Sequence, residues 1–176
     1  MEIRPIMKEF LTPIVKALQE RFSGQPTEFR GDVTVLLPAD QIIAAATALR
    51  DEFDFDMLSA ETAVDYCPQT NPRFHMVYIF YSTKHKVYLT FRAPVNGDDP
   101  KIATMETVFP NANWREREIW DLMGIRFEGH SDMRRLLLPP NWVGHPLRKD
   151  YPLGYEEVQH SFNFNDIDLR KPKGVR

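Results

Sequence analysis

The sequence has very little cysteine and no long apolar run. Its 176 residues include one cysteine, Cys67, so an intrachain disulfide is excluded and a cysteine-ligated metal or iron–sulfur site is not expected. No stretch approaches the roughly 20 apolar residues that a membrane-spanning helix requires. The N-terminal stretch MEIRPIMKEF has neither the apolar core of a signal peptide nor the composition of a transit peptide. These absences predict a soluble protein of a reducing compartment, without a membrane span of its own.

A strong excess of one charge is also missing, because the formal net charge is -3 at pH 7. General nucleic-acid-binding proteins usually carry a large basic excess, so no nucleic-acid partner is expected. Hydrophobic residues make up 43% of the chain and charged residues 27%, as in an ordinary globular protein. The length is sufficient for one domain with a proper core.

Several catalytic and nucleotide-binding motifs are absent as well. The chain contains no G-x-S-x-G, which would place a nucleophilic serine in a strained turn. It contains neither G-x-G-x-x-G nor G-x-x-x-x-G-K-[ST], the loops that cradle dinucleotide or nucleotide phosphates. A serine hydrolase is therefore not predicted, and neither is binding of NAD, flavin or ATP by these routes.

Periodicity predicts most of the elements before residue 125. Helices are expected at 12–24, with Thr12 as its cap and Pro13 in its first turn, at 39–53 and at 113–124, and a shorter one after Pro100 carries Ile102, Met105 and Phe109. Strands are expected at 32–38, 55–66, 74–82 and 86–95; the third is apolar on both faces and the fourth alternates cleanly. This order predicts an α+β fold, with helices packed on one face of a mostly antiparallel sheet.

The helix expected at 113–124 carries local signals at both ends. Asn113 and Glu116 have the spacing of a capping box, and Gly124 is suited to end the helix. Arg117 and Asp121 lie four residues apart, a spacing at which they can form an ion pair.

Regular periodicity fails from Arg126 onward. The segment is interrupted by Pro139, Pro140, Pro146 and Pro152, yet it contains leucine, tryptophan and tyrosine residues that favour burial. A long irregular segment is uncommon inside a compact domain, but it is readily explained if it lies along a partner. We therefore divide the chain into an α+β domain, residues 1–125, and a C-terminal arm, residues 126–176, which is extended, binds a partner and ends in a basic tail.

Candidate catalytic and metal-binding groups have simpler structural interpretations. Glu116 and Glu118 lie two apart on a helix and point in different directions, which favours a cap and a structural ion pair over an acid–base pair. His130, Asp132 and His145 lack the spacing of a zinc motif. Each histidine follows a glycine, which favours hydrogen bonding to the backbone in a turn.

The segment EREIWDLMGIRFEGHSDMRRLL, followed by PPNWVGHPLRKDYPL, resembles the hallmark region of the C subunit of respiratory NADH:quinone oxidoreductase, complex I. Related subunits of membrane-bound hydrogenases and of the photosynthetic NDH-type complex share this pattern. The residues that carry the resemblance, and that are expected at the interface with partner subunits, are Glu116, Arg117, Glu118, Asp121, His130, Arg134, Arg135, Trp142, Gly144, His145, Pro146, Leu147, Arg148, Lys149, Asp150 and Tyr151. Ser131 is a departure, because the family often has proline there.

The resemblance implies a protein with no catalytic residue, metal or redox cofactor of its own, in a complex that holds NADH, FMN, iron–sulfur clusters and quinone. It implies a peripheral place in the hydrophilic part of that complex, on the cytoplasmic side of the bacterial plasma membrane. There it would dock on the D subunit, which is the large quinone-site subunit, and support electron transfer from NADH to quinone coupled to ion translocation. Trp142, Leu147 and Tyr151 would be apolar anchors, and Arg134, Arg135, Arg148, Lys149 and Asp150 would make charged contacts.

Two other classes of function compete with this interpretation. A free-standing hydrolase that uses His130 and Glu118 would need a solvent-accessible His130. An RNA-binding module that uses the arginines and tryptophan of the C-terminal arm predicts an affinity that falls steeply with salt.

Overall fold

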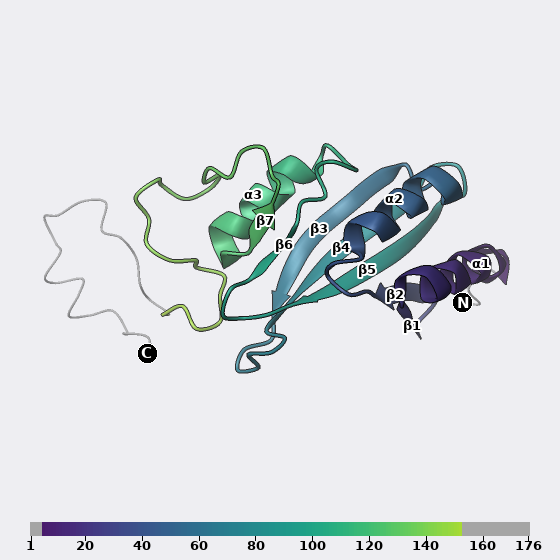
Figure 1. Ribbon diagram of the computed structural model, residues 1–176, viewed down its shortest axis with the longest axis horizontal. Coiled ribbons are helices and arrows are strands. Elements are labelled where there is room, and N and C mark those ends of the chain that lie inside the picture. Colours follow the sequence, from purple (N-terminus) through teal and green to yellow (C-terminus); the bar gives the residue numbers. More distant parts are fainter. Residues whose placement is uncertain (1–4, 153–176) are drawn as a thin grey trace, which may run out of the picture.

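The computed structural model describes residues 5–152, and side chains from Phe10 onward (Figure 1). Its elements are α1 (Pro5–Phe22), β1 (Gln25–Phe29), β2 (Asp32–Leu36), α2 (Ile42–Phe53), β3 (Met57–Asp65), β4 (Phe74–Ser82), β5 (Val87–Val95), β6 (Lys101–Ala103), α3 (Ala112–Met123) and β7 (Arg126–Glu128). The basic tail that the sequence predicts lies outside the described residues.

The main sheet has five strands in the order β1-β2-β5-β4-β3. All of its pairs are antiparallel except β2 with β5, which run parallel. Separately, β6 and β7 form a short parallel pair. Figure 1 shows α2 lying across the main sheet and α3 beside β3, with α1 and β1 at the opposite end of the molecule from the C-terminal arm. The predicted α+β class, with helices on a mostly antiparallel sheet, is confirmed.

Side-chain alternation along β4 and β5 builds the core. The buried residues of β5 are Val87, Leu89, Phe91, Ala93 and Val95, the face that the sequence pattern predicts. On β4 every second residue from Phe74 to Phe80 is buried, and the residues between them are half-buried. A strand paired on both sides has neighbours over both faces, which explains the apolar character of both faces of β4.

The N-terminal helix and hairpin differ from the prediction. Helix α1 begins at Pro5, so Pro13 lies inside the helix and not in its first turn. Pro13 has no backbone N–H, so the helix loses one hydrogen bond there. Packing offsets the cost of this lost bond, because Leu11, Ile14 and Leu18 around it are buried in the core. Strand β1 was not predicted. All five of its residues are exposed, so the strand has no buried face that would produce an alternating pattern in the sequence.

The short helix expected after Pro100 is also wrong. Residues 101–103 form β6, in which Ile102 pairs with Phe127 of β7, and both side chains are buried. Met105 and Phe109 are buried as well, but in a turn whose Phe109 N–H donates to the Met105 carbonyl. The apolar spacing is thus satisfied by a strand and a turn.

The division of the chain at residue 125 stays a prediction; β7 lies just beyond it.

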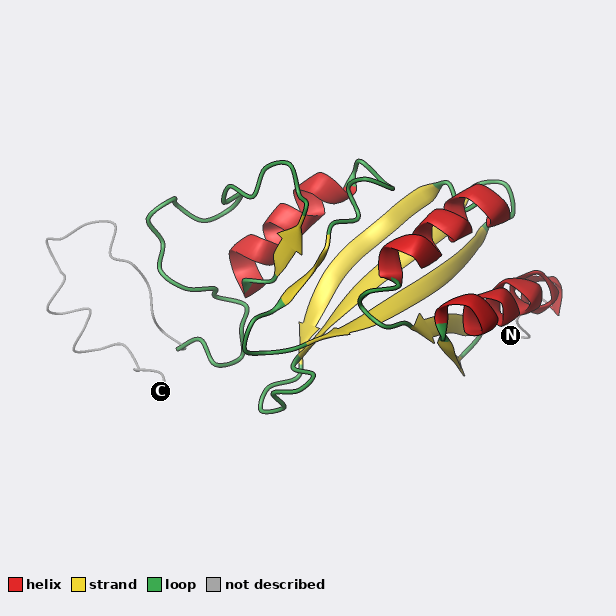
Figure 2. Cartoon of the chain, viewed as in Figure 1, coloured by secondary structure: helices red, strands yellow, loops and turns green. Residues whose placement is uncertain are grey.

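Helix α3 is placed between the edge of the sheet and the C-terminal arm. It packs on β3, the edge strand, and β7 follows it directly. Residues 129–152 form no helix or strand, and Figure 2 shows them as a green loop that passes around α3. The hallmark residues therefore lie on one helix and on the segment that surrounds it.

Candidate functional site

The centre of the site is the carboxylate of Asp121 on α3, which is fully buried. Its Oδ2 accepts the N–H groups of Leu136, Leu137 and Leu138 at 3.1, 2.8 and 2.9 Å. Its Oδ1 accepts Nη1 of Arg135 at 2.6 Å. Burial opposes ionisation, but these hydrogen bonds outweigh it and hold the pKa of Asp121 below its ordinary value. Three successive N–H groups on one oxygen fix the course of the C-terminal arm here.

Two arginines hold the next part of the C-terminal arm through backbone carbonyls. Arg117 on α3 donates from Nε to the Arg134 carbonyl at 3.0 Å and from Nη2 to the Arg135 carbonyl at 3.3 Å. The side chain of Arg135 then donates from Nη2 to the carbonyls of Trp142 at 2.9 Å and Gly144 at 3.4 Å. The guanidinium of Arg117 thus fixes the backbone at residues 134–135, and the guanidinium of Arg135 fixes it at residues 142–144. Side chains enclosed by the loop therefore determine its course.

The C-terminal end of α3 is closed by side chains of the C-terminal arm. Gly124 ends the helix in the left-handed conformation, at φ +71°. Arg148 donates to the carbonyls of Met123 and Gly124 at 2.6 and 3.3 Å, and Nδ1 of His145 donates to the Asp121 carbonyl at 2.9 Å. A cation at this end of a helix satisfies unpaired carbonyls and the helix dipole together. The predicted end of the helix at Gly124 is confirmed.

A second attachment joins the end of the described C-terminal arm to the sheet. Arg73, just before β4, donates from Nη2 to Asp65 at 2.9 Å and to Asp150 at 2.7 Å. Asp65 also accepts the N–H groups of Cys67 and Lys149, each at 2.9 Å. Burial opposes the ionisation of Asp65, but Arg73 and these N–H groups lower its pKa to about 2. The sequence did not reveal this site, because Arg73 and Asp150 are 77 residues apart.

The imidazole of His130, at the start of the C-terminal arm, has no exposed side-chain area. Its Nδ1 accepts the N–H of Asp132 at 2.9 Å, so Nε2 donates to the Asn113 carbonyl at 3.1 Å. His130 follows Gly129, a turn residue at φ +85°. The expectation that both histidines bind the backbone is confirmed, since His145 binds a carbonyl as well.

Three local predictions on α3 are wrong. The helix begins one residue before Asn113, whose amide donates to Glu106 at 2.9 Å and forms no cap. Arg117 and Asp121 do not pair with each other, because both are bound to the C-terminal arm. Glu118 is exposed and forms no ion pair with residues 5–152. The site's polar groups are committed to long-range contacts that a local pattern does not show.

The predicted charged contacts divide into two groups. Arg135, Arg148 and Asp150 are bound within the chain, to Asp121, to the end of α3 and to Arg73 respectively. Arg134 and Lys149 project outward; the Arg134 side chain is 81% exposed and pairs with Asp132. An interface role for any of these residues stays a prediction.

The predicted apolar anchors are also unequal. Trp142 and Tyr151 are half-buried, and the Tyr151 ring lies against Gly144, where a Cβ would come within 2.8 Å of it. Leu147 is 55% exposed. The other large apolar side chains exposed in this region are Trp114 at 62%, Leu137 at 60% and Val143 at 71%. Leu137 is one of the leucines expected to be buried against a partner, and its contact stays a prediction. Trp114 and Val143 were not predicted as contacts, because their exposure depends on the packing around α3 and no sequence pattern marks it.

The buried position of His130 contradicts a hydrolase that uses His130 and Glu118. A general base must reach the proton that it removes, and both ring nitrogens already bind the backbone. Within residues 5–152 no group of three or more His, Cys, Asp or Glu residues is arranged to hold a metal ion. No helix in that range combines the length and apolar character needed to cross a bilayer.

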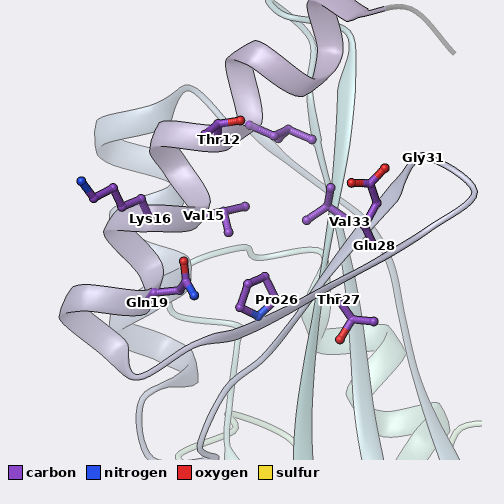
Figure 3. A pocket seen from close by; sticks show the side chains of 10 residues that line it. Thr12, Val15, Lys16, Gln19, Pro26, Thr27, Glu28, Gly31 and Val33 are labelled. Atoms are coloured by element: carbon purple, nitrogen blue, oxygen red, sulfur yellow. The ribbon is translucent and has the colours of Figure 1, made fainter.

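A groove of about 630 Å³ lies at the other end of the molecule, between α1 and the β1–β2 hairpin (Figure 3). Val15, Pro26 and Val33 contribute apolar surface to it, while Lys16 points away from the groove in this view. Its described lining holds no titratable cluster. It lies in the N-terminal part of the chain, far from the hallmark residues.

Comparisons with known proteins identify a family for the chain. Residues 35–157 match the family model described as "Respiratory-chain NADH dehydrogenase, 30 Kd subunit". The C subunit of NADH-quinone oxidoreductase from Geotalea uraniireducens is 45% identical over 139 residues, which cover 77% of this chain and 84% of that protein. The corresponding protein of Herpetosiphon aurantiacus is 41% identical over 162 residues, covering 88% and 94%.

Two solved structures share the fold. A trypsin-resistant fragment of Nqo5 superposes with a TM-score of 0.62 and 26% identity, covering 70% of this chain and 98% of the fragment. A chain of the membrane-bound sulfane sulfur reductase, an archaeal respiratory membrane complex, gives a TM-score of 0.70 at 22% identity, covering 83% and 85%. At that identity the second likeness concerns the fold alone. With its hallmark helix and C-terminal arm, and with relatives matched over most of their length, the chain belongs to the family of the 30 kDa subunit, or C subunit, of respiratory NADH-quinone oxidoreductase.

Proposed function

We propose that the chain is a non-catalytic structural subunit of an NADH:quinone oxidoreductase, and that its C-terminal arm docks on the large quinone-site subunit, the D subunit. In this role it supports electron transfer from NADH to quinone, coupled to ion translocation, while NADH, FMN, iron–sulfur clusters and quinone are held by other subunits. The proposed location is peripheral, on the cytoplasmic side of the bacterial plasma membrane. Membership of the family supports the role in the complex; the geometry of the C-terminal arm supports docking.

The observation that carries the proposal is how the C-terminal arm is held. Its polar contacts run inward, from Asp121, Arg117 and Arg148 to backbone groups, so an irregular segment has a defined shape without regular structure. A segment ordered in advance loses less conformational entropy on binding than one that orders on contact.

The groups left on the outside of the C-terminal arm are suited to a partner. Leu137, Val143 and Leu147 are each more than half exposed, although large aliphatic residues usually favour burial. Arg134 provides an exposed guanidinium near them in sequence. Exposed apolar residues with a charged neighbour are typical of protein–protein contacts. We therefore assign the docking contact to these residues, with Arg135 and Arg148 shaping the segment beneath.

The test is affinity purification of the tagged chain from its native membranes in mild detergent, with NADH:quinone activity assayed in the eluate. The double variant Val143→Asp/Leu147→Asp should lower the amount of co-purified complex by at least about tenfold, because two buried carboxylates oppose docking. Its urea unfolding midpoint should match the wild type, since both side chains are exposed in the single chain.

A control is Phe29→Asp, which places one carboxylate on an apolar side chain that is 68% exposed at the opposite end of the molecule. It should co-purify the complex in wild-type amounts. Normal co-purification of the double variant would contradict docking through the C-terminal arm. Recovery of the wild-type chain alone, from intact membranes, would contradict the subunit role itself.

A further inference from the structure

A pair of buried polar side chains lies under α3 and takes no part in holding the C-terminal arm. Glu61 of β3 is 7% exposed and Tyr78 of β4 is fully buried. They are direct cross-strand neighbours in the sheet register, so both side chains point to the same face. Neither carboxylate oxygen of Glu61, nor the hydroxyl of Tyr78, has a hydrogen-bond partner within the described chain.

A second carboxyl group faces this pair from the helix above. Glu116 of α3 is fully buried and accepts hydrogen bonds from the Thr104 hydroxyl and the Met105 N–H. Both of its carboxylate oxygens are thus occupied by donors, and neither binds Glu61. Helix α3 packs on β3, the strand that carries Glu61.

The other charged and titratable groups near the pair do not neutralise it. Arg115 of α3 is the cation that acts on Glu61, and it is only half-buried. Glu106 adds a further negative charge beside Glu116. The ring of His130 lies 3.9 Å from Glu116 and 4.0 Å from Glu106, with both nitrogens bound to the backbone.

An ionised Glu61 would be very unfavourable in this place. A buried carboxylate that has no hydrogen bond loses its hydration, and the half-buried Arg115 compensates only a small part of that loss, whereas a neutral carboxylic acid loses far less. Burial, and then the charge of Glu116, raise the pKa of Glu61 well above its ordinary value. Burial likewise raises the pKa of Glu116 to about 7.

We propose that Glu61 is a proton-holding site: the folded chain keeps Glu61 as a neutral carboxylic acid beneath α3, and loss of that proton at alkaline pH weakens the packing of α3 on the sheet. Because α3 carries Arg117 and Asp121, the C-terminal arm loosens with it. This inference concerns the chain itself and does not depend on which partner the C-terminal arm meets.

The sign of the pH dependence follows from proton binding. Above the ordinary pKa of a glutamate, the unfolded chain has lost this proton and the folded chain keeps it, so raising the pH favours unfolding. The folding equilibrium constant should fall by about tenfold per pH unit for each retained proton. The contribution of Glu116 ends near its pKa of about 7. If Glu61 keeps its proton into the alkaline range, as proposed, its contribution continues above that pH.

Infrared spectroscopy of the full chain tests the proposal directly. At about pH 8.5, above the range in which Glu116 holds its proton, the wild type should still show the carbonyl band of a protonated carboxylic acid. Glu61→Gln should lose this band and should also lose the fall in stability between about pH 7 and about pH 9, measured by urea unfolding. Glu118→Gln, an exposed glutamate on α3, should keep both.

A wild-type spectrum without a protonated carboxyl at that pH would overturn the proposal, as would an unchanged band in Glu61→Gln. If Glu61→Gln does not fold, the infrared titration of the wild type decides alone. A band that persists above pH 8 supports the proposal, and one that disappears with Glu116 near pH 7 contradicts it.

Discussion

At the scale of single residues, Asp121 has the greatest effect on the shape of the C-terminal arm. Its carboxylate is the common acceptor of three backbone N–H groups and of Arg135, in a site with no access to water. Removal of one partner from such a site leaves the other groups buried without a hydrogen bond, which costs more than the pair contributes.

Asp121→Asn should therefore lower the free energy of unfolding by about 3 kcal/mol, because its amide cannot accept on both sides and leaves the charge of Arg135 without its carboxylate partner. Urea unfolding of the full chain measures the change. Glu118→Gln, three positions earlier on the exposed face of α3, should stay within about 0.5 kcal/mol of the wild type. Equal midpoints for the two variants would show that Asp121 does not hold the arm.

At the scale of elements, the junction between α3 and the C-terminal arm depends on one glycine. Gly124 has a left-handed backbone, and a Cβ there would lie 2.5 Å from Cδ2 of His145 and 2.6 Å from Nη2 of Arg148. Gly129 has a similar backbone, at φ +85°, but a Cβ there would meet only Thr104, at 3.5 Å. The two positions differ in packing and share the same backbone requirement.

Alanine at either position should carry the left-handed backbone cost of roughly 1–2 kcal/mol. Gly124→Ala should lose a further amount of about 1–3 kcal/mol, because His145 and Arg148 must move away from the end of α3. Urea unfolding gives both values, and limited proteolysis of the C-terminal arm should be faster in Gly124→Ala. Similar losses in the two variants would contradict close packing at this junction.

Elements with a long, regular pattern could be predicted from the sequence. The alternation of 86–95, the apolar run of 74–82 and the spacing of 113–124 correspond to β5, β4 and α3 within one or two residues. Strands β6 and β7 have three residues each, too few for a period, and β1 is wholly exposed. The hallmark of the family was visible because it is a run of residue types, and the family it predicts is confirmed.

The contacts within the site could not be predicted, for a different reason. Arg117, Arg135 and Arg148 bind backbone carbonyls, which every residue has, so no complementary residue type appears in the sequence. Glu61 and Tyr78 become neighbours through the pairing of β3 with β4. Their burial without hydrogen-bond partners depends on which part of the sheet α3 covers. Such features exist only once the elements are packed.

At the scale of the whole molecule, Asp65 and Arg73 connect the sheet to the end of the described part of the C-terminal arm. The Asp65 side chain is 2% exposed and Arg73 is 11% exposed, and Asp150 completes the bridge. Because the pKa of Asp65 is lowered to about 2, this bridge stabilises the folded chain above pH 4 and is lost as the pH falls toward 2.

We expect the Asp65 bridge to contribute about 2 kcal/mol at neutral pH, because it lowers the pKa of Asp65 from about 4 to about 2. Asp65→Asn should therefore be less stable than the wild type near neutral pH, and the difference should shrink on acidification; urea unfolding across this range measures it. Asp32→Asn, at an exposed position on β2, should follow the wild-type curve. The amide resonance of Lys149, whose N–H binds Asp65, should shift only in Asp65→Asn. A constant difference at all pH values would contradict a bridge that depends on ionised Asp65.

The arginine contacts to backbone carbonyls also affect how this surface can evolve. Arg135 binds the carbonyl of Trp142, and Arg148 binds that of Met123, so these acceptors survive most substitutions at the residues that supply them. Val143 lies between Trp142 and Gly144, whose carbonyls both bind Arg135. Its side chain can therefore change while the main chain keeps its course. A lineage can thus alter the surface offered to a co-evolving partner by single mutations, without having to rebuild the segment that presents it.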